Sequence, residues 1–288
     1  MATIRNPIEW GADQLKQAAQ HAESVGSSLR GTQARTRSEH LIVHRIEIAD
    51  LRDVLSKGLA DFGSYRTDVV FLCIIYPLIG LVLARFALDA DLLPLLFPAA
   101  SGFALLGPVA AVGLYEMSRQ REQGIQASWA DAFGMIRSPS FGTIVVLGLI
   151  LLAIFLLWMG AAQVIYMLTL GPEPPVSATA FIGDVFTSGA GWAMIVVGMG
   201  VGFLFAVVVL AISVVSFPLL LDRDVGLGKA ISTSVRVVAE NPGPMAAWGL
   251  IVAGGLVIGS IPLFLGLIVV MPVLGHGTWH LYRKTVAR

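Results

Sequence analysis

The sequence has 288 residues, of which 56% are hydrophobic and 13% are charged, and its mean hydropathy is +0.79. A typical soluble domain carries about 25% charged residues, so this composition argues against a soluble globular protein. The formal net charge is zero. No basic patch is interleaved with aromatic residues, which argues against nucleic-acid binding. The single cysteine, Cys73, excludes an intrachain disulfide and a cysteine-based zinc or iron–sulfur site within this chain.

Two different segments precede the apolar part of the chain. Residues 1–45 are rich in Gln, Ser, Arg and Ala and are predicted to form a polar, largely flexible tail. The stretch 48–62 alternates apolar and charged residues with helical spacing, which predicts an amphipathic helix. Its apolar stripe consists of Ile48, Leu51, Val54, Leu55, Leu59 and Phe62, and its polar face of Asp50, Arg52, Asp53, Lys57 and Asp61. Directly before a membrane span, such a helix is predicted to lie on the cytoplasmic membrane surface. The alternative is a short solvated helix packed on the protein's own loops.

Residues 46–288 are predicted to form one helical membrane domain, because apolar runs of about 20 residues match the thickness of the bilayer core. The predicted fold is all-α, with six transmembrane helices paired as three hairpins. The predicted spans are 69–88, 92–115, 142–168, 192–221, 245–261 and 262–279. An amphipathic stretch precedes each hairpin: 48–62, then Trp129, Phe133 and Ile136, then Ile231, Val235 and Val238.

The region 245–279 is compatible with two structures. It is about 35 residues long, or roughly 50 Å of helix at 1.5 Å per residue, against a bilayer core of about 30 Å. Ser260, Ile261 and Pro262 interrupt it near its middle. Two short spans joined by a tight turn are predicted, and a re-entrant hairpin is the competing interpretation.

Orientation follows from the placement of Lys and Arg. Of the 19 Lys and Arg residues, all but Arg85 lie in the segment 1–68, the loops 116–141 and 222–244, or the C-terminal tail. Positively charged segments stay in the cytoplasm, so both termini and these two loops are predicted to be cytoplasmic. The loop 171–191 is then predicted to face outward.

Two segments of the chain match at a constant offset and predict an internal repeat, at about 98–119 and 262–283. The matching positions are Pro98 with Pro262, Gly102 with Gly266, Pro108 with Pro272, Gly113 with Gly277, Tyr115 with Trp279, and Arg119 with Arg283. Prolines bend membrane helices and glycines allow close helix contacts, while the aromatic residue and the arginine suit the cytoplasmic interface. Both copies run from outside to inside, so the repeat is predicted to be parallel.

The first copy ends in the stretch GPVAAVGLYEMSRQREQG, residues 107–124. With this motif, the chain resembles the bacterial integral membrane family DUF2189 over roughly residues 45–285. The resemblance implies a multi-pass protein of the bacterial inner membrane. It implies no activity, because the family has none assigned.

The sequence offers little catalytic or metal-binding chemistry. Only His276 and His280 lie near a predicted span, and haem–copper chemistry needs several histidines inside the membrane. The two are four residues apart and share a helix face, but no neighbouring Glu or Asp completes a zinc-binding pattern. Their predicted role is that of polar residues at the interface, so no catalytic, cofactor or metal residue is predicted.

Three functional hypotheses follow. The first is a non-enzymatic accessory or assembly protein that binds a partner or lipid. The second is a transporter or channel for a small neutral or apolar solute, since internal repeats and proline-broken spans suit it. The third is a membrane enzyme using Glu116, Arg119 and His280 at the cytoplasmic rim. Membrane lipids are the expected partners, with another membrane protein or a second copy of the chain as further candidates.

Overall fold

The computed structural model describes residues 41–73, 93–125 and 138–286, together with positions 78, 80, 81 and 85. Within these residues every regular element is a helix, and one isolated β-bridge joins Val43 to Val286. The predicted all-α class is therefore confirmed. Residues 1–40, most of the predicted first span and the predicted amphipathic stretch at 129–136 lie outside the described residues.

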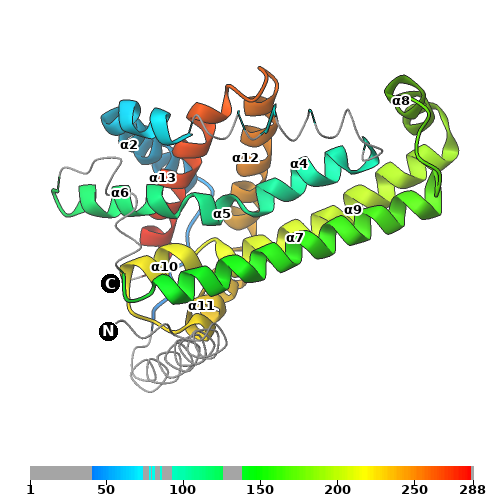
Figure 1. Cartoon of the computed structure of the whole chain (residues 1–288). Coiled ribbons are helices and arrows are strands. Elements are labelled where there is room, and N and C mark those ends of the chain that lie inside the picture. The colour runs from blue at the N-terminus through cyan, green and yellow to red at the C-terminus, as the bar shows by residue number, and fades with distance from the viewer. Residues whose placement is uncertain are drawn as a thin grey trace, which may run out of the picture.

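The helices separate into a head and an elongated stem (Figure 1). The head consists of α2 (Asp50–Cys73), α6 (Val112–Glu122), α10 (Ser216–Asp222), α11 (Leu227–Glu240) and the C-terminal half of α13 (Leu267–Thr285). The stem consists of α4 (Leu96–Leu105), α7 (Phe141–Thr169), α8 (Ala178–Thr187) and α9 (Gly189–Ser213). The short helix α5 (Gly107–Ala110) connects α4 to the head, and α12 (Pro242–Ser260) leads from α11 to α13.

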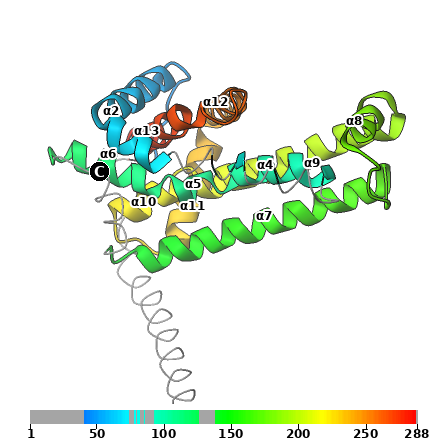
Figure 2. The same cartoon turned by 45° about the horizontal axis from the view of Figure 1, so that its top comes forward.

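In the stem, α7 and α9 run side by side and α8 lies at their far end (Figures 1 and 2). With 29 and 25 residues, α7 and α9 are about 43 and 37 Å long at 1.5 Å per residue, which is enough to cross a bilayer core. Trp158 of α7 joins the stem helices. Its indole nitrogen donates to the carbonyl oxygen of Pro98 in α4 at 2.9 Å, and its ring contacts Phe205 of α9 with centroids 5.7 Å apart.

Three helical segments among the described residues are long and apolar enough to span a membrane. They are Phe141–Thr169, Gly189–Asp222 and Pro242–Ser260, which agree with the third, fourth and fifth predicted spans. The Gly189–Asp222 segment is interrupted near Val214, after which α10 turns into the head, where Phe217, Leu219 and Leu220 are fully buried. Six crossings and three hairpins stay a prediction.

The predicted second span, 92–115, is a broken helix in the structure. A 3-10 turn (Leu93–Leu95), α4, α5 and α6 follow one another, with breaks at Leu106 and Ala111. Pro108 lies in the first turn of α5, where a backbone N–H has no acceptor within the helix, so the missing N–H of proline is tolerated. As a result, α4 follows α7 in the stem while α6 packs on α13 in the head.

The predicted amphipathic helix 48–62 forms as the start of α2, but its buried face differs from the predicted one. Leu51 and Val54 are buried as predicted, whereas Ile48 and Leu59 are 61% and 56% exposed. Asp61, assigned to the polar face, is 4% exposed and points into the protein. The cause is the partner of α2, which is α13 rather than a loop. Whether the exposed residues contact lipid stays a prediction.

The predicted amphipathic stretch at 231–238 is part of α11. Its buried residues are Ala230, Thr233, Ser234 and Val237, while Val235 is 41% exposed. The hydroxyl oxygen of Ser234 accepts a hydrogen bond from the backbone N–H of Val215 at 3.2 Å. This bond satisfies a backbone group that the break between α9 and α10 leaves free.

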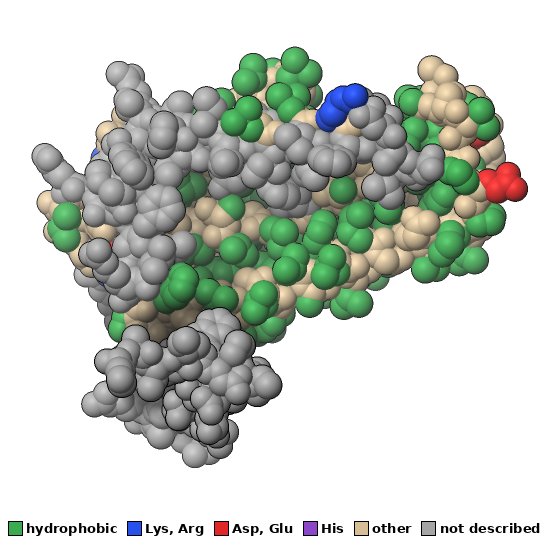
Figure 3. All heavy atoms as spheres, in the orientation of Figure 1, with side chains coloured by type: hydrophobic (Ala, Val, Ile, Leu, Met, Phe, Trp, Pro, Cys, Tyr) green, Lys and Arg blue, Asp and Glu red, His purple; other side chains and the backbone are tan. Residues whose placement is uncertain are grey.

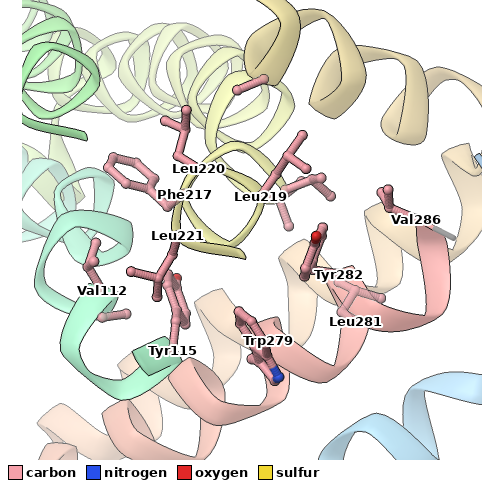
Figure 4. Close-up of a cluster of buried hydrophobic side chains, with 14 of the residues drawn as sticks. Val112, Tyr115, Phe217, Leu219, Leu220, Leu221, Trp279, Leu281, Tyr282 and Val286 are labelled. Atoms are coloured by element: carbon pink, nitrogen blue, oxygen red, sulfur yellow. The ribbon is translucent and has the colours of Figure 1, made fainter. Parts of the chain in front are cut away.

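The interior of the head is a cluster of apolar and aromatic side chains from α6, α10 and α13 (Figure 4). Tyr115, Phe217, Trp279 and Tyr282 are each at most 2% exposed. The N-terminal segment is tied to this part of the molecule by Asn241, whose amide oxygen accepts from Ile46 N at 2.8 Å and whose amide nitrogen donates to His44 O at 3.2 Å.

Candidate functional site

The most concentrated polar chemistry lies where α2 crosses α13. A Cβ added at Gly58 would lie 2.7 Å from the carbonyl oxygen of Val273 and 2.8 Å from the amide nitrogen of Gly277. Two glycines therefore bring the two backbones into direct contact, as small residues do between membrane helices. One turn after Gly58, Asp61 reaches the interior between α2, α6 and α13.

Asp61 is the centre of a network that we call the Asp61 cluster: Asp61, Ser118, Arg121, His276 and His280. The Ser118 hydroxyl donates to Asp61 Oδ2 at 2.6 Å, and His280 Nε2 donates to the same oxygen at 2.8 Å. Arg121 forms an ion pair with Asp61 Oδ1. The carboxylate, contributed by α2, therefore binds two side chains of α6 and one of α13.

His276 completes the cluster on its buried side. Its Nδ1 lies 2.7 Å from Ser118 Oγ, and its side chain is fully buried. Because Ser118 has one proton and donates it to Asp61, His276 Nδ1 carries a proton and donates to Ser118. The order of donation is thus from His276 to Ser118 to Asp61, which stabilises Asp61 as a carboxylate.

The electrostatics of Asp61 follow from these partners. Burial raises the pKa of its carboxyl group. The hydrogen bonds from His280 and Ser118, together with the electrostatic interactions with His280 and His276, lower this pKa by a larger amount, so it lies below the usual value near 3.8. Asp61 is therefore ionised at neutral pH. A buried carboxylate with three donors is strongly held, and removing one member leaves the others unsatisfied.

A second polar network closes the head beside the aromatic cluster. The Tyr282 hydroxyl donates to Asp222 Oδ2 at 2.7 Å, and Arg283 Nη1 lies 3.2 Å from the same oxygen. Arg283 also donates to Glu122 Oε1 at 3.1 Å. These bonds join the ends of α6, α10 and α13, which are distant in sequence.

The Asp61 cluster contains the residue types of a nucleophilic site without its arrangement. In such a site the histidine accepts the proton of the serine, and the carboxylate orients the histidine. Here the serine donates to the carboxylate, and Ser118 is 1% exposed. The arrangement is that of a structural clamp between three helices.

Of the three rim residues of the enzyme hypothesis, Glu116 and Arg119 are in contact, whereas His280 belongs to a different network. Arg119 donates to both oxygens of Glu116, at 2.8 and 2.7 Å, and Gln120 donates to Oε1 of the same carboxylate. His280 instead binds Asp61. His276 and His280 share the Asp61 cluster, yet in the described part of the chain no three His, Cys, Asp or Glu side chains have the geometry of a metal site.

The two predicted repeat copies, 98–119 and 262–283, differ in structure around their prolines but are similar near their C-terminal ends. Pro98 lies within α4, whereas Pro262 lies in the turn between α12 and α13. Pro108 is in the first turn of α5, and Pro272 is inside α13. The repeat as such stays a prediction.

The later repeat positions lie close together in the head. Tyr115 and Trp279 are buried in the same cluster, facing one another from α6 and α13 (Figure 4). The corresponding arginines both form ion pairs, Arg119 with Glu116 and Arg283 with Glu122. The remaining members are Gly102 in α4, Gly113 in α6, Gly266 before α13 and Gly277 in α13. Gly102 lies against Phe155 and Gly266 against Gly259.

Comparison with known proteins supports the membrane assignment. Residues 96–222 match the family DUF2189, described as a predicted integral membrane protein. The resemblance noted in the sequence is thus confirmed, over a shorter range than the 45–285 expected from it. The DUF2189 match includes the stem, α6 and α10, hence Ser118 and Arg121, but not Asp61, His276 or His280. No curated protein and no solved structure matches the chain.

Sequence reasoning identified His276 and His280 but missed Asp61 and Ser118. A signal was present: Leu51, Val54, Gly58 and Asp61 recur at spacings of three and four, just as the chosen apolar stripe does. Asp61 stands at the end of this series, but because aspartate is charged it was predicted to lie on the solvent-exposed face of the helix. Its burial depends on donors from α6 and α13, which no local pattern in α2 reveals.

Proposed function

We propose that this protein is a non-enzymatic accessory protein of the bacterial inner membrane, which binds a partner membrane protein or lipid through its stem. The observation that carries this proposal is the exposure of the stem. In the most apolar part of the Gly189–Asp222 segment, only 6% of the residues are buried within the chain. Figure 3 shows hydrophobic side chains spread along the visible face of the stem.

The exposed surface of α9 is large and apolar. Val196, Phe203 and Leu204 are each more than 60% exposed. Such a surface is covered by acyl chains or by another helix when the protein is in its membrane. In the described part of the head, Ile48 and Leu59 are also exposed, but most of the large apolar side chains of α6, α10 and α13 are buried.

The orientation is part of the proposal. Three segments predicted to be cytoplasmic from their Lys and Arg residues contribute to the head: residues 1–68 through α2, residues 116–141 through the end of α6, and the C-terminal tail through the end of α13. Their contact supports a location of all three on one side of the membrane. Because positively charged segments stay inside, we place the head in the cytoplasm and α8 at the outer surface.

Site-specific photocross-linking in native membranes tests the proposed binding surface. A photoreactive phenylalanine analogue replaces Phe203 on the stem or, as a control, Ser232, an exposed residue of α11 in the head. A protein adduct of one defined mass at Phe203 and none at Ser232 is expected. Adducts with phospholipid alone at Phe203 would restrict the role to lipid binding.

Two other results would contradict the accessory role. A protein adduct formed only at Ser232 would place the partner on the head rather than on the stem. A bound solute in the interior of the purified protein, identified by mass spectrometry after mild detergent extraction, would favour the transporter hypothesis.

A further inference from the structure

We propose that α12 and α13 form a re-entrant hairpin: it enters the bilayer from the side of the head, ends among the acyl chains and returns to the same side. The partner of its tip is lipid hydrocarbon. This inference is independent of the accessory role, because it concerns only how the last hairpin sits in the membrane. It replaces the two short spans predicted for 245–279 and keeps the C-terminus on the side of the head.

The free arms of the hairpin are too short to cross. Met245 and Trp248, in the first turns of α12, are each 1% exposed and belong to the head. From Gly249 to Ser260, α12 has about 12 residues, or roughly 18 Å of helix. A bilayer core is about 30 Å thick. The other arm is shorter still, because α13 is buried in the head from Leu274 onward.

The tip of the hairpin is apolar. From Ile261 to Met271 the chain has no polar side chain. Ile261, Leu263 and Leu265 are 76%, 70% and 58% exposed. A turn in water normally uses polar residues, glycine or proline. This turn contains Pro262 but no polar side chain, and its three exposed aliphatic side chains suit a hydrocarbon environment.

Most backbone N–H groups of the tip donate to carbonyl oxygens close by in the chain. Leu263 N donates to Ile261 O at 2.9 Å, Phe264 N to Ser260 O at 3.1 Å, and Leu265 N to Pro262 O at 3.0 Å. Pro262 has no N–H, and the Ser260 hydroxyl donates to Leu256 O at 2.8 Å. Internal satisfaction is required in hydrocarbon, where no water can bond to free groups.

The backbone conformation of the tip points the same way. Leu263 and Phe264 have positive φ angles, 52° and 64°. Such angles disfavour residues with a Cβ and usually select Gly or Asn. Leu263 and Phe264 therefore adopt these angles at a conformational cost, and transfer of their side chains into hydrocarbon is an interaction that offsets such a cost.

The neighbours of the tip place it within the membrane rather than beyond it. A Cβ at Gly80 would lie 3.0 Å from the ring of Phe264. Gly80 is near the middle of the predicted first span, 69–88. In Figures 1 and 2 the turn between α12 and α13 also lies well away from α8, which marks the far end of the stem.

The experiment combines side-specific labelling with depth measurement in proteoliposomes. Single cysteines are placed in the full chain with Cys73 replaced by Ala. The test position is Leu263→Cys, with Val176→Cys before α8 and Ser232→Cys in the head as references for the two sides. Met199→Cys, exposed in the middle of α9, is the reference for the bilayer centre.

For Leu263→Cys we expect no reaction with an impermeant maleimide from either side until detergent is added. After labelling with bimane, its fluorescence should be quenched by doxyl groups deep in the acyl chains, as at Met199→Cys. Labelling from the side of Val176→Cys would show two crossings and overturn the proposal. Labelling from the side of Ser232→Cys would show a hairpin in water and would also overturn it.

Discussion

The head and the stem use apolar residues in opposite ways. In the stem, α9 is almost entirely apolar, and most of its surface is exposed. In the head, α13 is less apolar, yet its side chains from Leu274 to Trp279 are all buried, His276 among them. The apolar side chains of the stem therefore need a surrounding apolar phase, whereas those of the head are buried against one another. Hydropathy identifies the first kind of helix correctly, but for α13 it predicts a membrane span where the helix is buried within the protein.

The largest expected difference in stability is between a buried and an exposed leucine of the same helix, α7. Leu147 of α7 is fully buried, whereas Leu157 of the same helix is 65% exposed. Leu147→Ala should lower the free energy of unfolding by about 2–5 kcal/mol, because a cavity replaces a packed side chain. Leu157→Ala should change it by less than about 1 kcal/mol in detergent. Thermal unfolding of both variants in one detergent measures the contrast, and equal losses would contradict it.

The crossing of α2 and α13 gives the next largest effect. Gly58→Ala places a Cβ less than 3 Å from the backbone of α13, which cannot move aside as a side chain can. We expect a loss of about 1–3 kcal/mol, typical of overpacking. Gly63→Ala is the matched control, because nothing lies within 4 Å of its added Cβ. There, replacing a helical glycine should stabilise by about 0.5–1 kcal/mol. Equal melting temperatures would mean that α2 does not pack tightly on the head.

Asp61 tests whether the polar interior of the head is a clamp. Asp61→Asn keeps the shape of the side chain but removes the charge that Arg121 and His280 face. Breaking a buried ion pair costs about 3–5 kcal/mol when both groups are fully desolvated. Arg121 and His280 are partly exposed, so about 2–3 kcal/mol is expected here. Asp53→Asn, which alters the exposed ion pairs of Asp53 with Lys57 and Lys284, should cost less than about 1 kcal/mol.

The pH dependence of stability distinguishes the charge of Asp61 from its packing. Because the folded-state pKa of Asp61 lies below its usual value, its stabilising contribution is complete above the unfolded-state pKa. That contribution is lost as the pH falls below about 4. The wild type should therefore lose stability relative to Asp61→Asn between about pH 5 and 3. A constant difference over this range would show that the carboxylate charge does not contribute.

Much of the stem could be predicted from the sequence, and most of the head could not. The span predicted at 142–168 forms α7, Phe141–Thr169. A long uncharged segment in a bilayer must satisfy its own backbone hydrogen bonds, and a helix does so. The burial of Asp61 depends on Ser118 and His280, which are distant in sequence. Likewise, the break at Ala111 sends α6 onto α13, a contact that local hydropathy does not encode.

The smallest expected effect concerns the exposed edge of the head. Lys284 of α13 lies 2.8 Å from Asp50 and 3.1 Å from Asp53, so it links the end of α13 to the first turns of α2. All three side chains are at least 28% exposed, and solvent therefore screens these pairs. Lys284→Met should cost less than about 1 kcal/mol, and the cost should fall further as salt is raised.

Lys57→Met is the matched control, since Lys57 pairs with Asp53 within α2 and joins no second element. Its cost should be about 0.3–0.5 kcal/mol, the value of a helical pair four residues apart. Melting temperatures at low and high salt measure both variants. If Lys284→Met destabilised the protein as strongly as Asp61→Asn, the exposed edge would hold α2 in place. The buried Asp61 cluster would then not be the principal clamp of the head.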